Sequence, residues 1–339
     1  MKPDDTVSAI IPVRNEEATI ERAVCSLAEQ PEIQEILVVN DQSTDGTSRV
    51  LERLAATERK LRPLDAGPLP PGWVGKNHAA WQGAQRASRN WLLFTDADAV
   101  HLAGSTSRAL ADARASGATM ISYSPAQEMH TWWERALIPF IYCRLSQLYS
   151  YAAVNDPRSE AAAANGQYLL IRRDAYNLIG GHVAVWGEVL EDVALARRAK
   201  AAGVPLHFAP DAGIARVRMY ATFRAMWEGW TKNLFPLVTV PGQSVTRELF
   251  SALPWIPLLC FVLAPVHLVF GALGLLLLAG RHASYAASLR RNHFALSNVQ
   301  YYIVAFALYG CVLLASDWHY ARGKVAWKGR EYPVGNSRA

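Results

Sequence analysis

The sequence predicts an α/β domain with a mostly parallel, open sheet and helices on both faces, followed by apolar C-terminal segments. Short apolar runs alternate with helical patterns in the first part of the chain, which is the order expected of a parallel sheet with right-handed crossovers. Polar residues follow the carboxyl ends of these runs, where open sheets bind ligands. Two long stretches near the C-terminus contain no Asp, Glu, Lys or Arg.

The predicted elements follow from the period of the apolar residues. The expected strands are residues 7–13, 36–39, 91–94, 119–123 and 168–171, which are apolar or rich in β-branched side chains. Helical spacing predicts helices after each of the first two strands, at residues 105–115, and again from residue 220 onward.

The composition limits the partners and the cell compartment. Of the 339 residues, 51% are hydrophobic and 19% are charged, and the formal net charge is +5. A positive charge suits a partner that carries phosphates or an anionic membrane surface. The four cysteines have neither metal-ligand nor redox-motif spacing, so we expect reduced packing residues. No apolar run precedes the first strand, so we expect no signal peptide and a cytoplasmic N-terminal domain.

The two aspartates that follow the run at 91–94 are the first candidate site. Asp96 and Asp98 are separated by one residue, so in an extended chain their side chains point to the same side. Two such carboxylates repel each other unless a cation lies between them. Mg²⁺ or Mn²⁺ is the natural occupant because these ions prefer oxygen ligands. The alternative is a solvated turn in which both aspartates cap a helix.

Two further motifs place charge at the starts of predicted helices. A loop rich in Pro and Gly, residues 68–75, delivers Lys76 to a helix start, where a lysine can contact phosphate. An exposed loop lysine is the alternative. Glu191 and Asp192 begin another helix, and adjacent acids at this position are most often helix caps and partners of the helix dipole.

The apolar stretches predict two membrane spans, near residues 254–280 and 296–316, because each uncharged gap exceeds the ~20 residues needed to cross a bilayer. Two spans would place the basic tail on the side of the N-terminal domain, as the positive-inside rule expects. The connecting loop would then carry Arg281, Arg290 and Arg291 on the outer side, which contradicts the rule. A re-entrant or interfacial segment is the alternative.

The stretch from Trp132 to Tyr151 combines six aromatic residues with Arg135 and Arg144. This mixture is typical of an interfacial helix in the headgroup layer, and ordinary core packing is the alternative.

Taken together, four motifs resemble those of a family-2 glycosyltransferase with the GT-A fold. In order they are Ile-Pro-Val-Arg-Asn-Glu-Glu (11–17), Val-Asn-Asp-Gln-Ser-Thr-Asp-Gly-Thr (39–47), Asp-Ala-Asp (96–98) and Glu-Asp (191–192). The resemblance covers roughly residues 7–235. More narrowly, Pro-Gly-Trp-Val-Gly-Lys (71–76) and the two apolar segments resemble membrane-anchored members that act on hopanoid or carotenoid lipids.

The resemblance implies roles for the matching residues. The nucleotide-binding residues would be Pro12, Arg14, Glu16, Asp41, Lys76 and Asp96. Asp41 would accept a hydrogen bond from uracil, and Asp98, with Asp96, would hold a divalent cation. Asp192, beside Glu191, would be the general base. Contacts with phosphate or acceptor are expected at Asn165, Gln167, Arg224, Trp230 and Lys232. Asn40 departs from the pattern, because many members have an aspartate there.

The implied reaction is transfer of a sugar from a nucleotide-sugar, expected to be a UDP-sugar, to a membrane lipid with Mg²⁺ or Mn²⁺ as cofactor. Direct displacement assisted by one base inverts the anomeric centre. Transfer to polyprenyl phosphate and a catalytically inactive membrane-anchored scaffold are the alternatives. We expect a catalytic domain at residues 1–235, a membrane region at 236–339, a multi-pass protein with its catalytic domain in the cytoplasm, and no nucleic-acid partner.

Overall fold

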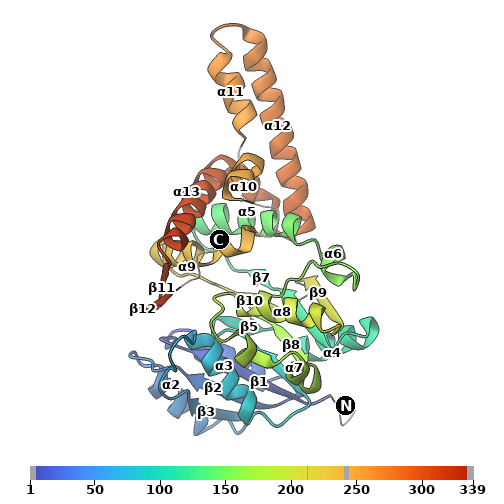
Figure 1. Cartoon of the computed structure of the whole chain (residues 1–339), viewed down its shortest axis with the longest axis vertical. Helices are drawn as coiled ribbons and strands as arrows, with labels where there is room; N and C mark the ends of the chain where they lie inside the picture. The colour runs from blue at the N-terminus through green and yellow to red at the C-terminus, as the bar shows by residue number, and fades with distance from the viewer. Residues whose placement is uncertain (1–4, 212, 240–243, 253, 334–339) are drawn as a thin grey trace. The chain divides into compact units, whose positions relative to one another are not determined.

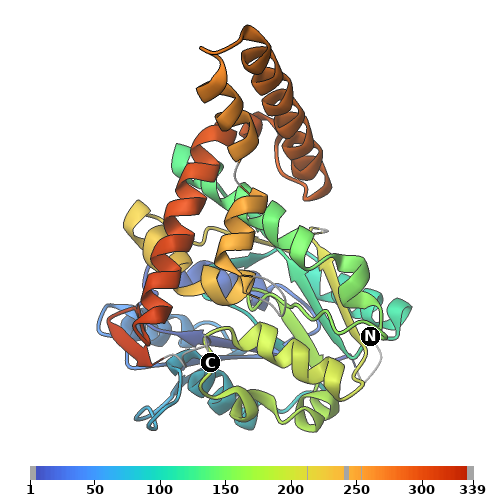
Figure 2. The same cartoon turned by 45° about the horizontal axis from the view of Figure 1, so that its top comes forward.

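The computed structural model describes residues 5–211, 213–239, 244–252 and 254–333, which form two compact units (Figures 1 and 2). Of these, residues 5–128, 151–219 and 328–332 belong to the first unit, and residues 129–150, 220–327 and 333 belong to the second. Residues 129–150 and 220–235, which we predict within the catalytic domain, thus belong to the second unit. The division between the units falls after residues 128, 150, 219, 327 and 332, whereas the predicted domain boundary is after residue 235.

A seven-stranded sheet forms the centre of the first unit, with strand order β3-β2-β1-β4-β8-β6-β9. Its strands are β1 (Val7–Val13), β2 (Ile33–Asn40), β3 (Leu61–Asp65), β4 (Trp91–Phe94), β6 (Met120–Ser124), β8 (Leu169–Arg172) and β9 (Leu206–Pro210). All neighbours pair in parallel except β8, which is antiparallel to both β4 and β6. The predicted open, mostly parallel sheet is confirmed.

Short strands complete the β-structure. A three-stranded sheet has the order β5-β10-β7, and a two-stranded sheet pairs β11 with β12. Their bounds are β5 (Ala99–His101), β7 (Ala126–Gln127), β10 (Ala215–Val217), β11 (Lys324–Trp327) and β12 (Arg330–Pro333). These strands, with β3 and β9, are absent from the sequence prediction because they are too short or too polar to show a clear apolar period.

The helices of the first unit connect these strands. They are α1 (Ile20–Ala28), α2 (Thr47–Ala55), α3 (Gly75–Arg86), α4 (Ser105–Ser116), α6 (Tyr151–Asn155), α7 (Arg173–Leu178), η1 (Gly181–Val185) and α8 (Glu191–Ala201). In α1 the residues with helical spacing, Ile20, Val24 and Leu27, are completely buried, as predicted.

The register of the central strands determines where the polar residues emerge. Ile10 of β1 lies opposite Phe94 of β4, and Val13 lies opposite Asn40 of β2. The strands themselves are buried, and full burial of one large apolar side chain stabilises a fold by about 1.5–3 kcal/mol. The residues that follow Val13, Asn40 and Phe94 therefore leave the sheet at one edge.

The second unit is helical. Its elements are α5 (Trp132–Leu148), α9 (Phe223–Val238), α10 (Val245–Ala252), α11 (Trp255–Leu263), α12 (Leu268–Arg291), η2 (Leu296–Tyr301) and α13 (Tyr302–Ala321). Helix α13 packs against α9 and α5, and α11 lies beside α12 in both views (Figures 1 and 2). On α5, Trp133 and Phe140 are buried, as core packing requires, whereas Trp132 is 55% exposed. Insertion of α5 into a headgroup layer stays a prediction.

Within the described residues, two helical segments are long and apolar enough to cross a membrane, Leu268–Arg291 and Leu296–Ala321. The second contains the predicted segment 296–316. The first predicted segment, 254–280, is divided in the structure into α11 and the start of α12, with Pro265 in the intervening turn. This proline lacks the N–H that a continuous helix needs.

The three arginines expected in a loop between the spans, Arg281, Arg290 and Arg291, instead belong to α12. The predicted loop is therefore wrong. Arg290 and Arg291 end the first candidate segment and precede the second, so the conflict with the positive-inside rule remains for a topology with two spans.

Gly83 allows α3 to pack closely on the sheet. A Cβ atom at Gly83 would lie 2.5 Å from Cγ2 of Ile10 and 3.1 Å from Cγ2 of Val39. In a helix, alanine is favoured over glycine by about 1 kcal/mol, but overpacking a core costs about 1–3 kcal/mol. We therefore expect Gly83→Ala to destabilise the protein in denaturant unfolding of the full chain. Gln85→Ala, at an exposed position of the same helix, is the control, and an increase in stability for Gly83→Ala would contradict the close packing.

Candidate active site

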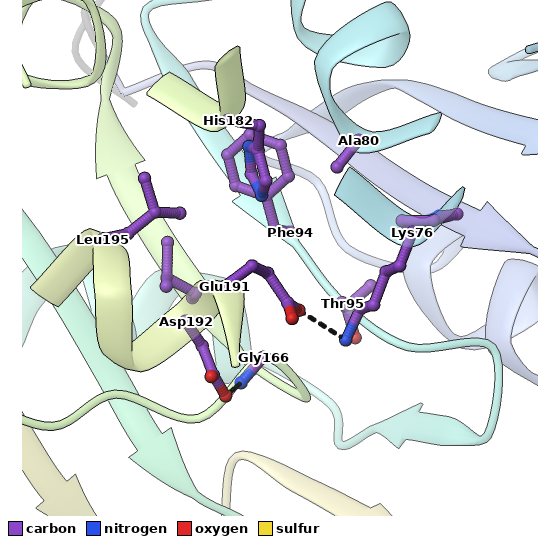
Figure 3. Close-up of a pocket in the computed structure, with 11 residues that line it drawn as sticks. Lys76, Ala80, Phe94, Thr95, Gly166, His182, Glu191, Asp192 and Leu195 are labelled. Atoms are coloured by element: carbon purple, nitrogen blue, oxygen red, sulfur yellow. Dashed lines mark hydrogen bonds and ion pairs between the residues drawn. The ribbon is translucent and has the colours of Figure 1, made fainter. Parts of the chain in front are cut away.

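Lys76 links two carboxylates that are distant in the sequence. Its Nζ atom lies 2.7 Å from Oδ1 of Asp96 and 2.7 Å from Oε1 of Glu191, and the pair with Glu191 is drawn in Figure 3. Burial opposes protonation, but the carboxylates of Asp96, Glu191 and Asp192 raise the pKa of Lys76 well above its usual value. Lys76 is therefore a permanent cation in this acidic cluster.

Hydrogen bonds connect the start of α3 to the segment that precedes α8. The side-chain nitrogen of Asn77 donates to the carbonyl oxygens of Val185 and Glu188, each at 2.8 Å. Val74 N–H donates to the carbonyl of Trp186 at 2.9 Å. Asn77 is fully buried, so these contacts fix Glu191 and Asp192 relative to Lys76.

Asp192 is held by backbone N–H groups on both carboxylate oxygens. Its Oδ2 accepts from Gly166 at 2.8 Å, and its Oδ1 accepts from Val193 at 2.8 Å. Burial, followed by the charge of Glu191, raises the pKa of Asp192 to about 6, while Lys76 and the two N–H groups oppose a larger rise. A carboxylate with this pKa accepts protons effectively near neutral pH.

Gly166 is a site residue that the sequence patterns do not identify. A Cβ atom at this position would lie 3.1 Å from Nζ of Lys76 and 3.2 Å from Oε1 of Glu191. Its N–H also orients Asp192 (Figure 3). The Asn-Gly-Gln segment ahead of β8 is visible in the sequence, but the close approach that favours glycine there becomes apparent only in three dimensions.

A cleft in the first unit is lined by this cluster and by apolar residues. Its polar lining includes Lys76, Gly166, Glu191 and Asp192. The ring of His182 lies near Phe94 (Figure 3). Burial, followed by the charge of Lys76, lowers the pKa of His182 to about 3. His182 is thus neutral, and it contacts the hydroxyl group of Tyr176 at 3.0 Å.

Asp96 and Asp98 fit one side of a divalent cation site. Oδ1 of Asp98 is buried and has no hydrogen-bond partner among the described residues. Burial, followed by the charges of Asp96 and Glu16, raises the pKa of Asp98 to about 8. A cation would relieve this repulsion. The described residues contain no group of three or more His, Cys, Asp or Glu that could hold a metal ion, so further ligands would come from phosphate oxygens or water.

The residues at the ends of β1 and β2 form a second polar cluster. Nη1 of Arg14 donates to the carbonyl oxygens of Asp41 at 2.8 Å and Gln42 at 3.1 Å. Asp41 is buried, and its side chain pairs with Arg330, while Glu16 pairs with Lys328. Pro12 lines the cleft described above. Neither basic partner is identified as a site residue from the sequence.

Asn165 and Gln167 flank Gly166. Oδ1 of Asn165 accepts from the backbone N–H of Gln167 at 2.9 Å, and Oε1 of Gln167 accepts from Nε2 of Gln127 at 3.3 Å. Both side chains thus stabilise the loop that presents the Gly166 N–H. Their predicted contacts with phosphate or acceptor remain predictions.

Three predicted site residues belong to the second unit. Arg224 forms an exposed pair with Glu228 at 2.8 Å, and Trp230 is buried. Nζ of Lys232 lies 4.6 Å from the ring centre of Trp327. The structure does not place these residues in the same unit as the carboxylates, and their roles remain predictions.

The cation of Lys76 lowers the pKa of Asp192, so we expect Lys76→Met to raise that pKa above about 6. Carbon-13 NMR titration of labelled aspartate carboxyls in the full chain measures this shift. Arg86→Met removes a charge from the exposed end of the same helix and is the control. An unchanged Asp192 titration in Lys76→Met would show that the cluster is not coupled as its geometry indicates.

Comparison with known proteins shows which enzymes this chain is similar to. The chain is 26% identical to the 4,4′-diaponeurosporenoate glycosyltransferase of Staphylococcus aureus (strain USA300), over 97% of this chain and 88% of the relative. The fold is similar to that of a mannosyltransferase from Pyrobaculum calidifontis, solved in complex with GDP-Man and Mn²⁺. That likeness has a TM-score of 0.52 at 18% identity and covers 94% of this chain and 89% of the other.

The family model described as "Glycosyl transferase family 2" matches residues 8–180, slightly more than half of the chain. Its match includes the β1, β2 and β4 strand ends, where the polar residues emerge. The chain is therefore a glycosyltransferase and belongs to glycosyl transferase family 2.

Proposed function

We propose that the protein transfers a sugar from a UDP-sugar to a membrane lipid with inversion at the anomeric carbon. The observation that carries this proposal is the environment of Asp192. Its carboxylate is oriented by two N–H groups, its pKa is raised to about 6, and it lies beside the Lys76 cluster. These are the properties of a general base that works near neutral pH.

The donor nucleotide would bind at the ends of β1 and β2. Asp41 carries a buried carboxylate oxygen, Oδ1, without a hydrogen-bond partner among the described residues. The N3–H group of uracil would satisfy it. Guanine also presents a ring N–H, so a GDP-sugar is the competing donor. Pro12 lies near the end of β1, Arg14 and Glu16 follow that strand, and all three would line this pocket.

A divalent cation, Mg²⁺ or Mn²⁺, would be held by Asp98 with Asp96. When bound, it neutralises charge on the departing diphosphate. Lys76 would hold Asp96 in place and supply a second positive charge near the phosphates. Oδ1 of Asp98, which is buried without a hydrogen-bond partner among the residues that the structure describes, supports this assignment.

The proposed chemical step needs one base. Asp192 would take the proton of the acceptor hydroxyl as the acceptor oxygen forms its bond to the anomeric carbon. The bond from that carbon to the diphosphate breaks at the same time, and UDP leaves. Glu191 would remain paired with Lys76. A single displacement of this kind inverts the configuration.

The proposed acceptor is a lipid, and the protein would be a multi-pass membrane protein with its catalytic unit in the cytoplasm. Support comes from the two helical segments that are long and apolar enough to cross a membrane. It also comes from the relative named for 4,4′-diaponeurosporenoate. That name denotes a carboxylate, whereas the acceptor proposed here presents a hydroxyl group that Asp192 would deprotonate. Asn165, Gln167, Arg224, Trp230 and Lys232 are the proposed contacts with the acceptor or phosphates.

The direct test of the base is Asp192→Asn in the full chain. We expect UDP binding to persist and the transfer rate to fall by about 10²–10⁴-fold, because only proton removal is lost. Radiolabelled transfer from UDP-sugars and GDP-sugars to extracted lipids measures the rate and identifies the donor. Asp174→Asn changes an exposed aspartate at the start of α7 and should transfer normally. A near-normal rate for Asp192→Asn would reduce Asp192 to a helix cap.

The proposed metal site makes a separate prediction. Asp98→Asn should lower cation-dependent transfer by at least about 10–100-fold, and EDTA should abolish transfer by the unmodified protein until Mg²⁺ or Mn²⁺ is restored. Asp174→Asn again serves as the matched control. Undiminished transfer in EDTA would rule out the assignment of Asp98 as a metal ligand.

A further inference from the structure

The turn between β11 and β12 reaches the ends of β1 and β2. We call Lys328–Arg330 the tail turn; it belongs to the first unit although it follows both candidate membrane helices in the sequence. Lys328 pairs with Glu16, and Arg330 pairs with Asp41. These are two of the residues predicted to bind the nucleotide.

The tail turn is anchored by backbone and side-chain contacts. Nε of Arg14 donates to the carbonyl oxygen of Lys328 at 3.2 Å, and Nζ of Lys328 donates to the carbonyl oxygen of Arg14 at 2.9 Å. Lys328 and Gly329 have φ angles of 46° and 75°, as a two-residue hairpin turn with positive φ requires. The turn thus directs its two cations at the strand ends from a defined backbone.

Arg330 engages one half of the Asp41 carboxylate. Its Nη1 contacts Oδ2 of Asp41, and its Nη2 donates to Oε1 of Gln42 at 2.7 Å. The side chains of Arg330 and Asp41 are 15% and 5% exposed. Oδ1 of Asp41 stays buried without a hydrogen-bond partner among the described residues, although an unsatisfied buried acceptor costs about 1–3 kcal/mol. An acceptor kept in this state is suited to a donor group on a ligand.

We propose that the tail turn completes the nucleobase pocket and that Arg330 is a positioning residue for Asp41. By occupying Oδ2, Arg330 leaves Oδ1 directed at the ring N–H of the base, uracil in the proposed donor. Selection of the nucleobase would then depend on Arg330, which follows the membrane region in the sequence. This inference rests on the proposed function in that the ligand is a nucleotide-sugar.

The same contacts could instead block the pocket, with the tail turn competing against the nucleotide. Two observations favour completion. Arg330 contacts Oδ2 of Asp41, whereas Oδ1, which a nucleobase would use, has no hydrogen-bond partner among the described residues. In addition, the two cations offset negative charge from Glu16 and Asp41, which would otherwise repel an anionic diphosphate.

The test compares nucleotide binding by Arg330→Ala, Arg330→Lys and Arg322→Ala in full-length protein in nanodiscs. Calorimetry gives the dissociation constants of UDP and CDP. The two nucleotides differ at N3 of the base, which donates a hydrogen bond in uracil and accepts one in cytosine. We expect Arg330→Ala to weaken UDP binding by about tenfold or more and CDP binding much less, so that selectivity falls. Arg330→Lys should restore part of it. Arg322→Ala removes an exposed charge from the same end of the chain and should leave both constants unchanged.

In transfer assays, Arg330→Ala should raise the KM for the donor with little change in kcat. Tighter UDP binding by Arg330→Ala would show a blocking segment and overturn the inference. Equal losses for UDP and CDP would show a structural role only and would also overturn it. If the unmodified protein prefers GDP to UDP, the proposed donor is wrong, and the comparison of GDP with ADP, which lacks a ring N–H at the pairing edge, tests Arg330 in the same way.

Discussion

The two ion pairs of Lys76 are the interaction on which the site depends. One cation joins Asp96, after β4, to Glu191, at the start of α8. Without it, several carboxylates would face one another in a cleft where burial already disfavours charge. The hydrogen bonds of Asn77 to the segment before α8 hold the same two parts of the chain together, so geometry and electrostatics at this point support each other.

This arrangement separates the properties of the two acids on which the proposed chemistry rests. Asp192, with two N–H donors and Lys76 nearby, has its pKa raised only to about 6. Asp98, whose Oδ1 is buried and which faces the like charges of Asp96 and Glu16, has its pKa raised to about 8. Acids whose environments differ in this way take different roles. In the proposed function the first accepts a proton, and the second requires a cation to be ionised near neutral pH.

Local sequence patterns were sufficient for the sheet centre, and the resemblance of four motifs was sufficient for the family. The runs at 7–13 and 91–94 match β1 and β4 in the structure because strongly apolar short runs have few other solutions. Gly166 and Arg330 escaped prediction for a physical reason. Their importance lies in contacts with residues far away in the chain, such as the Arg330–Asp41 pair, and no local period records such a contact. In the sequence, Arg330 is recognisable only as a positive charge that follows a candidate membrane segment.

The configuration of the product tests the central claim that one base, Asp192, assists a single displacement. The measurement is the NMR coupling constant of the anomeric proton in the glycosylated lipid. The lipid is formed from a donor whose sugar is α-linked. Inversion by a single displacement predicts a β-linked product. An α-linked product would require a second displacement or a different mechanism, and would contradict the role proposed for Asp192 and the cluster around it.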